Sequence, residues 1–256
     1  MGAVFAITRA MIKELIRKKD FYVLSLLLIC FLVFLSTQNF FQVDGISRYI
    51  KDLGYSLMTF FAFIIAVIFT AKQLPSEIES RTIYPLLAKP LSRHMLILSK
   101  FFGSLIISIS SYSIFFCVFV LFCFLKNTGI NNVLLLQAFI FGILFLCLTS
   151  SVVIFLSTFL TMAANVTISF LIYFLITGFA DVLYTAAVYS KGLKEAGLGV
   201  LYYIIPHMDF YDLRLRITHA WDPLKFWDVA VVIGYTLVYC SFLLYFAGNI
   251  FKGKRL

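Results

Sequence analysis

The sequence predicts an all-α integral membrane protein with six transmembrane helices. Of its 256 residues, 62% are hydrophobic and only 13% carry a charge, and the mean hydropathy is +1.00. That composition leaves too little polar surface to cover a soluble globule. A spanning helix needs roughly 20 apolar residues, and six stretches approach or exceed that length. They are Phe21–Thr37, Leu53–Ala71, Phe101–Leu125, Val133–Leu160, Val166–Ala187 and Val229–Phe251.

Residues 1–20 come before the first apolar stretch and predict a helix that lies in the membrane interface. Their apolar side chains recur on one helical face, and the basic side chains fall around the other, a pattern typical of helices bound to anionic headgroups. The alternative is a basic flank that only orients the first span. The rest of the chain, residues 21–256, is expected to form one transmembrane domain.

The distribution of Lys and Arg predicts that both termini lie in the cytosol. With the N-terminus inside, 13 of the 21 basic residues and 4 of the 12 acidic residues fall on the cytosolic side. The whole net charge of +9 is then cytosolic, as the positive-inside rule favours. This rule accounts for the basic balance, so no nucleic-acid partner is expected.

Residues 72–100 follow the second span and predict a cytosolic segment that contacts another protein. From Glu77 to Lys100 the segment is charged and is interrupted by proline, yet Ile78, Ile83 and Leu87 keep near-helical spacing. An apolar face on a charged segment needs a partner. The alternative is an interfacial helix that faces lipid and contacts no protein.

Residues 190–228, between the last two spans, predict a compact cap on the outer side. Phe210, Leu213 and Ile217 form an apolar stripe at helical spacing, which favours a short amphipathic helix on the membrane surface. The aromatic residues before the sixth span predict an interfacial belt; these are Trp221, Phe226 and Trp227. A metal site of His and Asp side chains between His207 and His219 is disfavoured, because their spacing fits no established ligand pattern.

Polar residues within the spans give only weak indications of a site. Ser104, Ser108 and Ser111 share one face of the third span, which favours close helix packing, as does Gly142 in the fourth; the alternative is a substrate path. Asp181 lies near the outer end of the fifth span, where an ionisable group either serves function or reaches water. All five cysteines fall within predicted spans and show no metal-ligand spacing.

Soluble catalytic motifs are missing from the sequence. It contains no GxxxxGK[ST] phosphate loop and no HExxH motif. The three histidines lie at or beyond the membrane edges, away from the hydroxyls of the spans. An intramembrane hydrolase is therefore disfavoured, and the chain is not expected to be an enzyme or to bind a cofactor directly.

The arrangement of these elements resembles the membrane subunit of type-two ATP-binding-cassette (ABC) exporters. The local likeness lies in residues 77–100, where an acidic cluster is followed by a threonine, a Leu-rich turn, a proline and a basic residue. The corresponding residues are Glu77, Glu79, Thr82, Leu86, Leu87, Pro90 and Arg93, with Lys100 at the mouth of the third span. Many members have glycine where this chain has Arg81. The PHMDFYDL stretch from Pro206 to Leu213 is similar to one branch, that of copper-site maturation and gliding-associated permeases.

The resemblance implies a machine of two permease subunits, identical or paralogous, and two soluble ABC ATPase subunits that use ATP and Mg. It implies that Glu77 and Glu79 face basic groups of the ATPase, and that Arg81 and Arg93 face its acidic rim. Ile78, Ile83 and Leu87 would fill its apolar floor, beside Thr82. Ser104, Ser108, Ser111 and Asp181 are the candidate substrate path.

The apolar spans favour a lipid-like or amphiphilic substrate over ions or sugars. A permease separate from its ATPase is typical of a prokaryotic inner membrane. The competing interpretation is a membrane scaffold or assembly factor without transport activity, which would need no ATPase.

Overall fold

A computed structural model describes residues 46–79, 93–126, 129–189 and 206–253, together with short helical stretches at 22–23, 26–27, 29–31 and 33–34. Within these residues every regular element is a helix and none is a strand, as the sequence predicts. The expected interfacial helix at residues 1–20 lies outside the described residues, as do residues 80–92 of the coupling segment and 190–205 of the cap.

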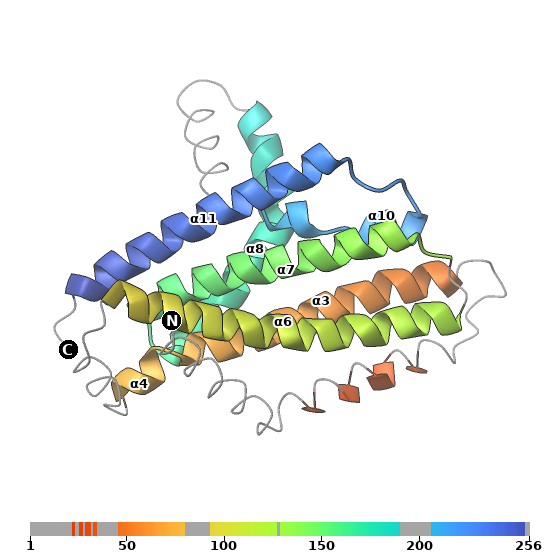
Figure 1. The fold of residues 1–256 in the computed structure, drawn as a ribbon. Helices are drawn as coiled ribbons and strands as arrows, with labels where there is room; N and C mark the ends of the chain where they lie inside the picture. The colour runs from red at the N-terminus through yellow and green to blue at the C-terminus, as the bar shows by residue number, and fades with distance from the viewer. Residues whose placement is uncertain are drawn as a thin grey trace.

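Among the elements described from residue 46 on, five are long helices and three are short ones that lie between them in the chain (Figure 1). Helices α3, α6 and α7 lie side by side, α11 runs along α7 and α6, and α8 crosses behind α7. In chain order the elements are α3 (Ile46–Lys72), α4 (Pro75–Glu79), α6 (Arg93–Leu125), α7 (Asn132–Ser157), α8 (Met162–Tyr189), η2 (Met208–Tyr211), α10 (Arg214–His219) and α11 (Phe226–Gly253).

Four of the described helices are long and apolar enough to cross a membrane. They are the Arg48–Lys72 part of α3, and α6, α7 and α11, which correspond to the second, third, fourth and sixth predicted spans. The predicted fifth span falls on α8, in which the apolar stretch Met162–Gly178 is shorter. The predicted first span, Phe21–Thr37, is described only in the short helical stretches at 22–23, 26–27, 29–31 and 33–34. The count of six spans therefore stays a prediction.

Helix α6 extends beyond the span predicted from hydropathy. It begins at Arg93 and not at Phe101, so Lys100, expected at the mouth of the span, lies inside the helix and is buried. Hydropathy marks the apolar part of a helix, whereas backbone hydrogen bonding continues wherever the added turns find contacts. Here Leu96 and Ile97 in those turns are buried in a cluster with α11.

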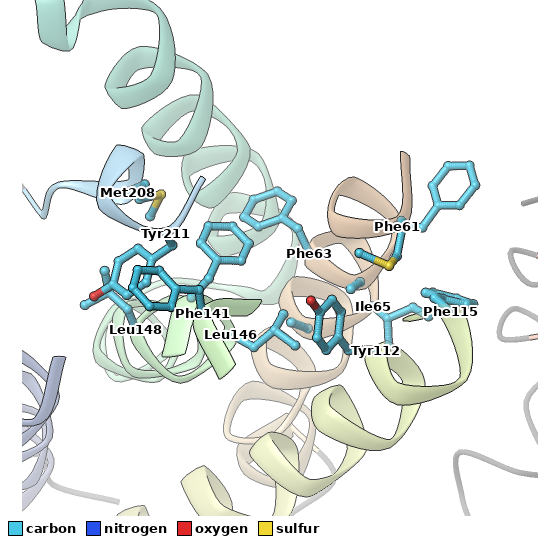
Figure 2. Close-up of a cluster of buried hydrophobic side chains, with 14 of the residues drawn as sticks. Phe61, Phe63, Ile65, Tyr112, Phe115, Phe141, Leu146, Leu148, Met208 and Tyr211 are labelled. Atoms are coloured by element: carbon cyan, nitrogen blue, oxygen red, sulfur yellow. The ribbon is translucent and has the colours of Figure 1, made fainter. Parts of the chain in front are cut away.

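The main core lies between α3, α6 and α7 and includes η2. Figure 2 shows part of this cluster, with Met208 and Tyr211 of η2 beside the residues of α7. Tyr112 of α6 packs directly on Gly142 of α7, where any Cβ would overlap its ring. The Tyr112 hydroxyl donates a hydrogen bond to the carbonyl of Ala138 over 3.1 Å. These contacts confirm the close helix approach expected at Gly142.

Candidate coupling site

The two ends of the helical bundle differ in their connections. At one end, which we call the basic end, α3 and α11 finish and α6 begins, next to α4 (Figure 1). At the opposite end, which we call the cap end, residues 206–225 lead into the start of α11. The described parts of the predicted coupling segment, residues 72–79 and 93–100, both lie at the basic end.

The chain turns sharply after α3 and starts α4 at once. The backbone N–H of Gln73 donates to the Thr70 carbonyl over 3.1 Å, which tightens the last turn of α3. Pro75 occupies the first position of α4, where its missing N–H costs nothing. Ser76 Oγ donates to the Lys72 carbonyl over 2.6 Å, which satisfies a carbonyl at the end of α3.

A second apolar cluster joins both arms of the coupling segment to α11. Leu74 contributes from the first arm, Leu96 and Ile97 contribute from the second, and Ala247 and Phe251 contribute from the last turns of α11. All five are buried. Ile78 of α4 is partly buried and packs against this cluster. The sequence predicts that this side chain fills the apolar floor of an ATPase, but part of its surface already contacts the same chain.

Arg93 binds the carboxyl end of α11. Its Nη1 donates hydrogen bonds to the carbonyls of Phe251, over 2.9 Å, and Lys252, over 3.0 Å. Its guanidinium carbon also lies 5.9 Å from the centre of the Phe251 ring, within the range of a cation–π contact. These carbonyls belong to the last turn of a helix. Carbonyl groups there have no N–H donor within the same helix and carry partial negative charge. Whether Arg93 also faces an ATPase stays a prediction.

His94 brings α6 and α11 close together at the same end. Its ring occupies the space where a Cβ on Gly248 would stand, so a side chain at position 248 would displace it. The ring also stacks on Tyr245, with centroids 6.2 Å apart and planes 19° apart. The contact therefore depends on the absence of a side chain at Gly248.

The remaining predicted coupling residues are not brought together by described side chains. Glu77 and Glu79 lie on α4, but the structure describes only their backbone. Arg81, Thr82 and Leu87 lie outside the described residues. Their proposed contacts with an ATPase stay predictions.

The three serines of the possible substrate path are all buried in α6. Each donates to a carbonyl of its own helix: Ser104 to Phe101, Ser108 to Ser104, and Ser111 to Ile107. They therefore act as small packing residues, with their hydroxyls satisfied locally and not across a helix contact. Asp181 lies on α8, and its side chain is outside the description.

The cap end corrects the expectation of a helix on the membrane surface. Met208, Tyr211, Leu213 and Ile217 are buried in the main core, whereas Phe210 of the predicted stripe is 50% exposed. The reason is local: η2 is a 3-10 helix that ends at Tyr211, and α10 starts afresh at Arg214. One helical period therefore does not run through both elements.

Polar contacts hold this buried segment among the long helices. The Tyr211 hydroxyl lies 2.8 Å from Thr236 Oγ1 of α11, and burial raises the pKa of Tyr211, so its phenol stays neutral. The His207 N–H donates to the Tyr235 hydroxyl over 3.0 Å. The second of these bonds satisfies a backbone N–H of the irregular stretch before η2.

Two further contacts fasten the segment to α7 and α3. Gln137 of α7 pairs with the backbone of Leu224: its Nε2 donates to the carbonyl over 2.8 Å, and its Oε1 accepts from the N–H over 2.9 Å. Arg214 Nε lies 3.5 Å from Asp52 Oδ1 of α3. The three predicted belt residues, Trp221, Phe226 and Trp227, are all exposed, as an interfacial position requires.

One pair of side chains was not anticipated from the sequence. The Sγ atoms of Cys147 on α7 and Cys240 on α11 lie 3.7 Å apart. Both cysteines are free thiols, and their separation of 93 positions gives no sequence signal. Within the described residues, no group of three or more His, Cys, Asp or Glu side chains is placed to hold a metal ion.

Comparison with known proteins identifies the family. A family model described as "ABC-2 family transporter protein" matches residues 6–252, which is almost the whole chain. A comparison with individual curated proteins gave no match.

Proposed function

Because this chain belongs to the ABC-2 family of transporter proteins, we propose that it is the membrane-spanning permease subunit of an exporter. In this proposal a separate ABC ATPase docks on residues 72–100 at the basic end, which faces the cytosol. The observation that supports it best is the convergence of both arms of this segment on the end of α11. A partner bound there would act on three long helices, α3, α6 and α11, at once.

The energy must come from outside this chain, since its sequence has no phosphate-binding loop. ATP and Mg are bound by the partner. Glu77 and Glu79 pair with basic groups of the ATPase, Arg81 pairs with an acidic group, and Thr82 and Leu87 complete the contact. Closure of two ATPases then moves α3 and α6 of two permease subunits, so that access alternates between the two sides of the membrane.

The proposed substrate is lipid-like or amphiphilic. The described spans are apolar over most of their length, and such a surface suits an apolar ligand better than an ion. Asp181 is proposed to border the path once two permease subunits, of the same or a paralogous chain, come together, whereas Ser104, Ser108 and Ser111, buried within α6, are assigned to helix packing. We place the complex in a prokaryotic inner membrane, with six spans and both termini in the cytosol.

The test is purification of the tagged protein from its native membrane in mild detergent, with identification of its partners and an ATPase assay of the eluate. The expected result is a soluble ATPase in near-equal amount. The double variant Glu77→Lys and Glu79→Lys should lose it, because both contacts change from attraction to repulsion. The matched control is the double reversal Asp222→Lys and Asp228→Lys, since both residues are exposed at the cap end.

Retention of the ATPase by the Glu77 and Glu79 variant would reject this docking site. Recovery of the wild-type protein alone, from membranes that preserve other such complexes, would reject the exporter. That second result would favour a scaffold or assembly role.

A further inference from the structure

Building on the proposed function, we propose that Arg93 is a positioning residue that transmits movement of the coupling segment to α11. Arg93 opens α6 directly after the part of the segment expected to contact the ATPase. Its guanidinium is bonded to the last carbonyls of α11. One side chain thus connects the exit of the coupling segment to the final helix of the permease.

The position of Arg93 is unfavourable for α6 alone. A cation in the first turn of a helix is repelled by the partial positive charge of that helix end. The first turn of α6 also contains no acidic residue to offset it. The carboxyl end of α11 supplies the complementary partial charge and two carbonyl acceptors, and Nη1 of Arg93 donates to both. The favourable interactions of Arg93 are therefore those with α11 and not those with the first turn of α6.

Helix α11 is well suited to be moved from its end. Only 11% of the residues in its most apolar window are buried, against 61% in the corresponding windows of α3 and α7. Of its five buried residues, Ala247, Gly248 and Phe251 lie in the last turns, whereas Thr236 and Cys240 lie further along the helix. At the basic end the helix is fastened by Arg93, the His94 contact at Gly248 and the apolar cluster around Phe251.

The contact between α6 and α11 at Gly248 is close enough for a movement of one helix to displace the other. Gly248 lets the His94 ring sit against the backbone of α11, so the two helices interlock in shape there. Packed contacts of this kind move as a unit or change to a second arrangement, and do not deform gradually. A shift of the first turns of α6 should therefore carry the last turns of α11 with it.

The experiment follows both helices in the complete complex with its ATPase in lipid nanodiscs. A fluorine-bearing amino acid is incorporated at Leu98 of α6 in one sample and at Ile250 of α11 in another; each native side chain is 41% exposed. The ¹⁹F spectrum is recorded with and without a non-hydrolysable ATP analogue. In the wild type, both probes should shift.

In Arg93→Ala the Leu98 probe should still shift on nucleotide binding, and the Ile250 shift should be lost. Lys252→Ala is the matched control, because it removes one positive charge from the same end and leaves the Lys252 carbonyl in place. It should keep both shifts. A wild-type Ile250 shift in Arg93→Ala would overturn the proposal, as would equal loss of this shift in Lys252→Ala.

Arg93→Lys provides a second reading if Arg93→Ala fails to fold or to bind the ATPase. A lysine keeps the charge, but its shorter side chain and rotating ammonium lack the fixed, planar N–H pair with which Nη1 of Arg93 reaches both carbonyls. A reduced Ile250 shift beside a normal Leu98 shift supports the proposal, and two normal shifts overturn it. If the wild-type protein binds no ATPase and shows neither shift, the proposed function is wrong. This outcome differs from failure of the Arg93 proposal, because it is seen in the wild type alone.

Discussion

The two ends of α11 are fastened by different kinds of contact. At the cap end, the segment 206–225 is fixed by directional hydrogen bonds from Tyr211, His207 and Gln137. At the basic end, the described contacts are the hydrogen bonds of Arg93, the packing of His94 on Gly248 and an apolar cluster. Directional bonds between buried polar groups specify one arrangement, because leaving any of them unmade is costly. Apolar contacts are less directional and allow a second arrangement more easily.

This difference fits the proposed roles of the two ends. In the proposed complex the ATPase acts on the basic end, so the helices there need to shift. The cap end lies on the outer side and needs one defined structure. Three substitutions test the comparison, each at one fastening, and they follow in order of expected effect.

The largest effect is expected at Gly248. Gly248→Ala places a Cβ inside the space of the His94 ring and should destabilise the protein by about 1–3 kcal/mol, as overpacking does. The measurement is the free energy of unfolding, or the melting temperature, in detergent. Gly234→Ala is the control on the same helix, because a Cβ there meets nothing within 4 Å; it should be neutral or stabilising by up to about 1 kcal/mol. Equal effects at the two glycines would contradict the fastening at the basic end.

The next effect is expected at Gln137. Gln137→Ala removes both part-buried bonds to the Leu224 backbone and should cost about 1–2 kcal/mol. Hydrogen exchange of the Leu224 amide should become faster, since its acceptor is lost. Asn132→Ala, an exposed position at the same end of α7, should change neither quantity. Unchanged exchange at Leu224 would show that the cap is held by other contacts.

The smallest effect is expected at Tyr211. Tyr211→Phe keeps the buried ring and removes only the hydroxyl that meets Thr236, so it should cost about 0.5–1.5 kcal/mol. Phe210→Leu is the neighbouring control, because that side chain is half-exposed. A double-mutant cycle with Thr236→Val measures the coupling between the two hydroxyls. A coupling energy of zero would mean that this bond does not hold η2.

The long helices were predictable because lipid imposes a simple rule on them. Four of the six predicted spans correspond to described helices that can cross a membrane, since apolar length alone decides that property. Gly142 was correctly expected at a close contact, because small residues recur where membrane helices approach.

The contacts that fasten the ends could not be predicted in the same way. Arg93 binds backbone carbonyls 158 and 159 positions away, and a backbone acceptor leaves no mark in the sequence. The burial of η2 was also missed, because a 3-10 turn followed by a new helix breaks the single period that the stripe Phe210, Leu213 and Ile217 assumed. Both features depend on where distant elements meet, and local patterns do not contain that information.

In the proposed complex, an ATPase acts on the basic end and not on the cap end. The most direct test places a photo-crosslinking amino acid at Thr82, within the coupling segment, or at Trp221, an exposed residue of the cap. After irradiation of native membranes, the crosslinked partner of each sample is identified by mass spectrometry. We expect a soluble ATPase joined at Thr82 and not at Trp221. No ATPase at Thr82 in membranes shown to contain it, or equal crosslinking at both positions, would contradict it.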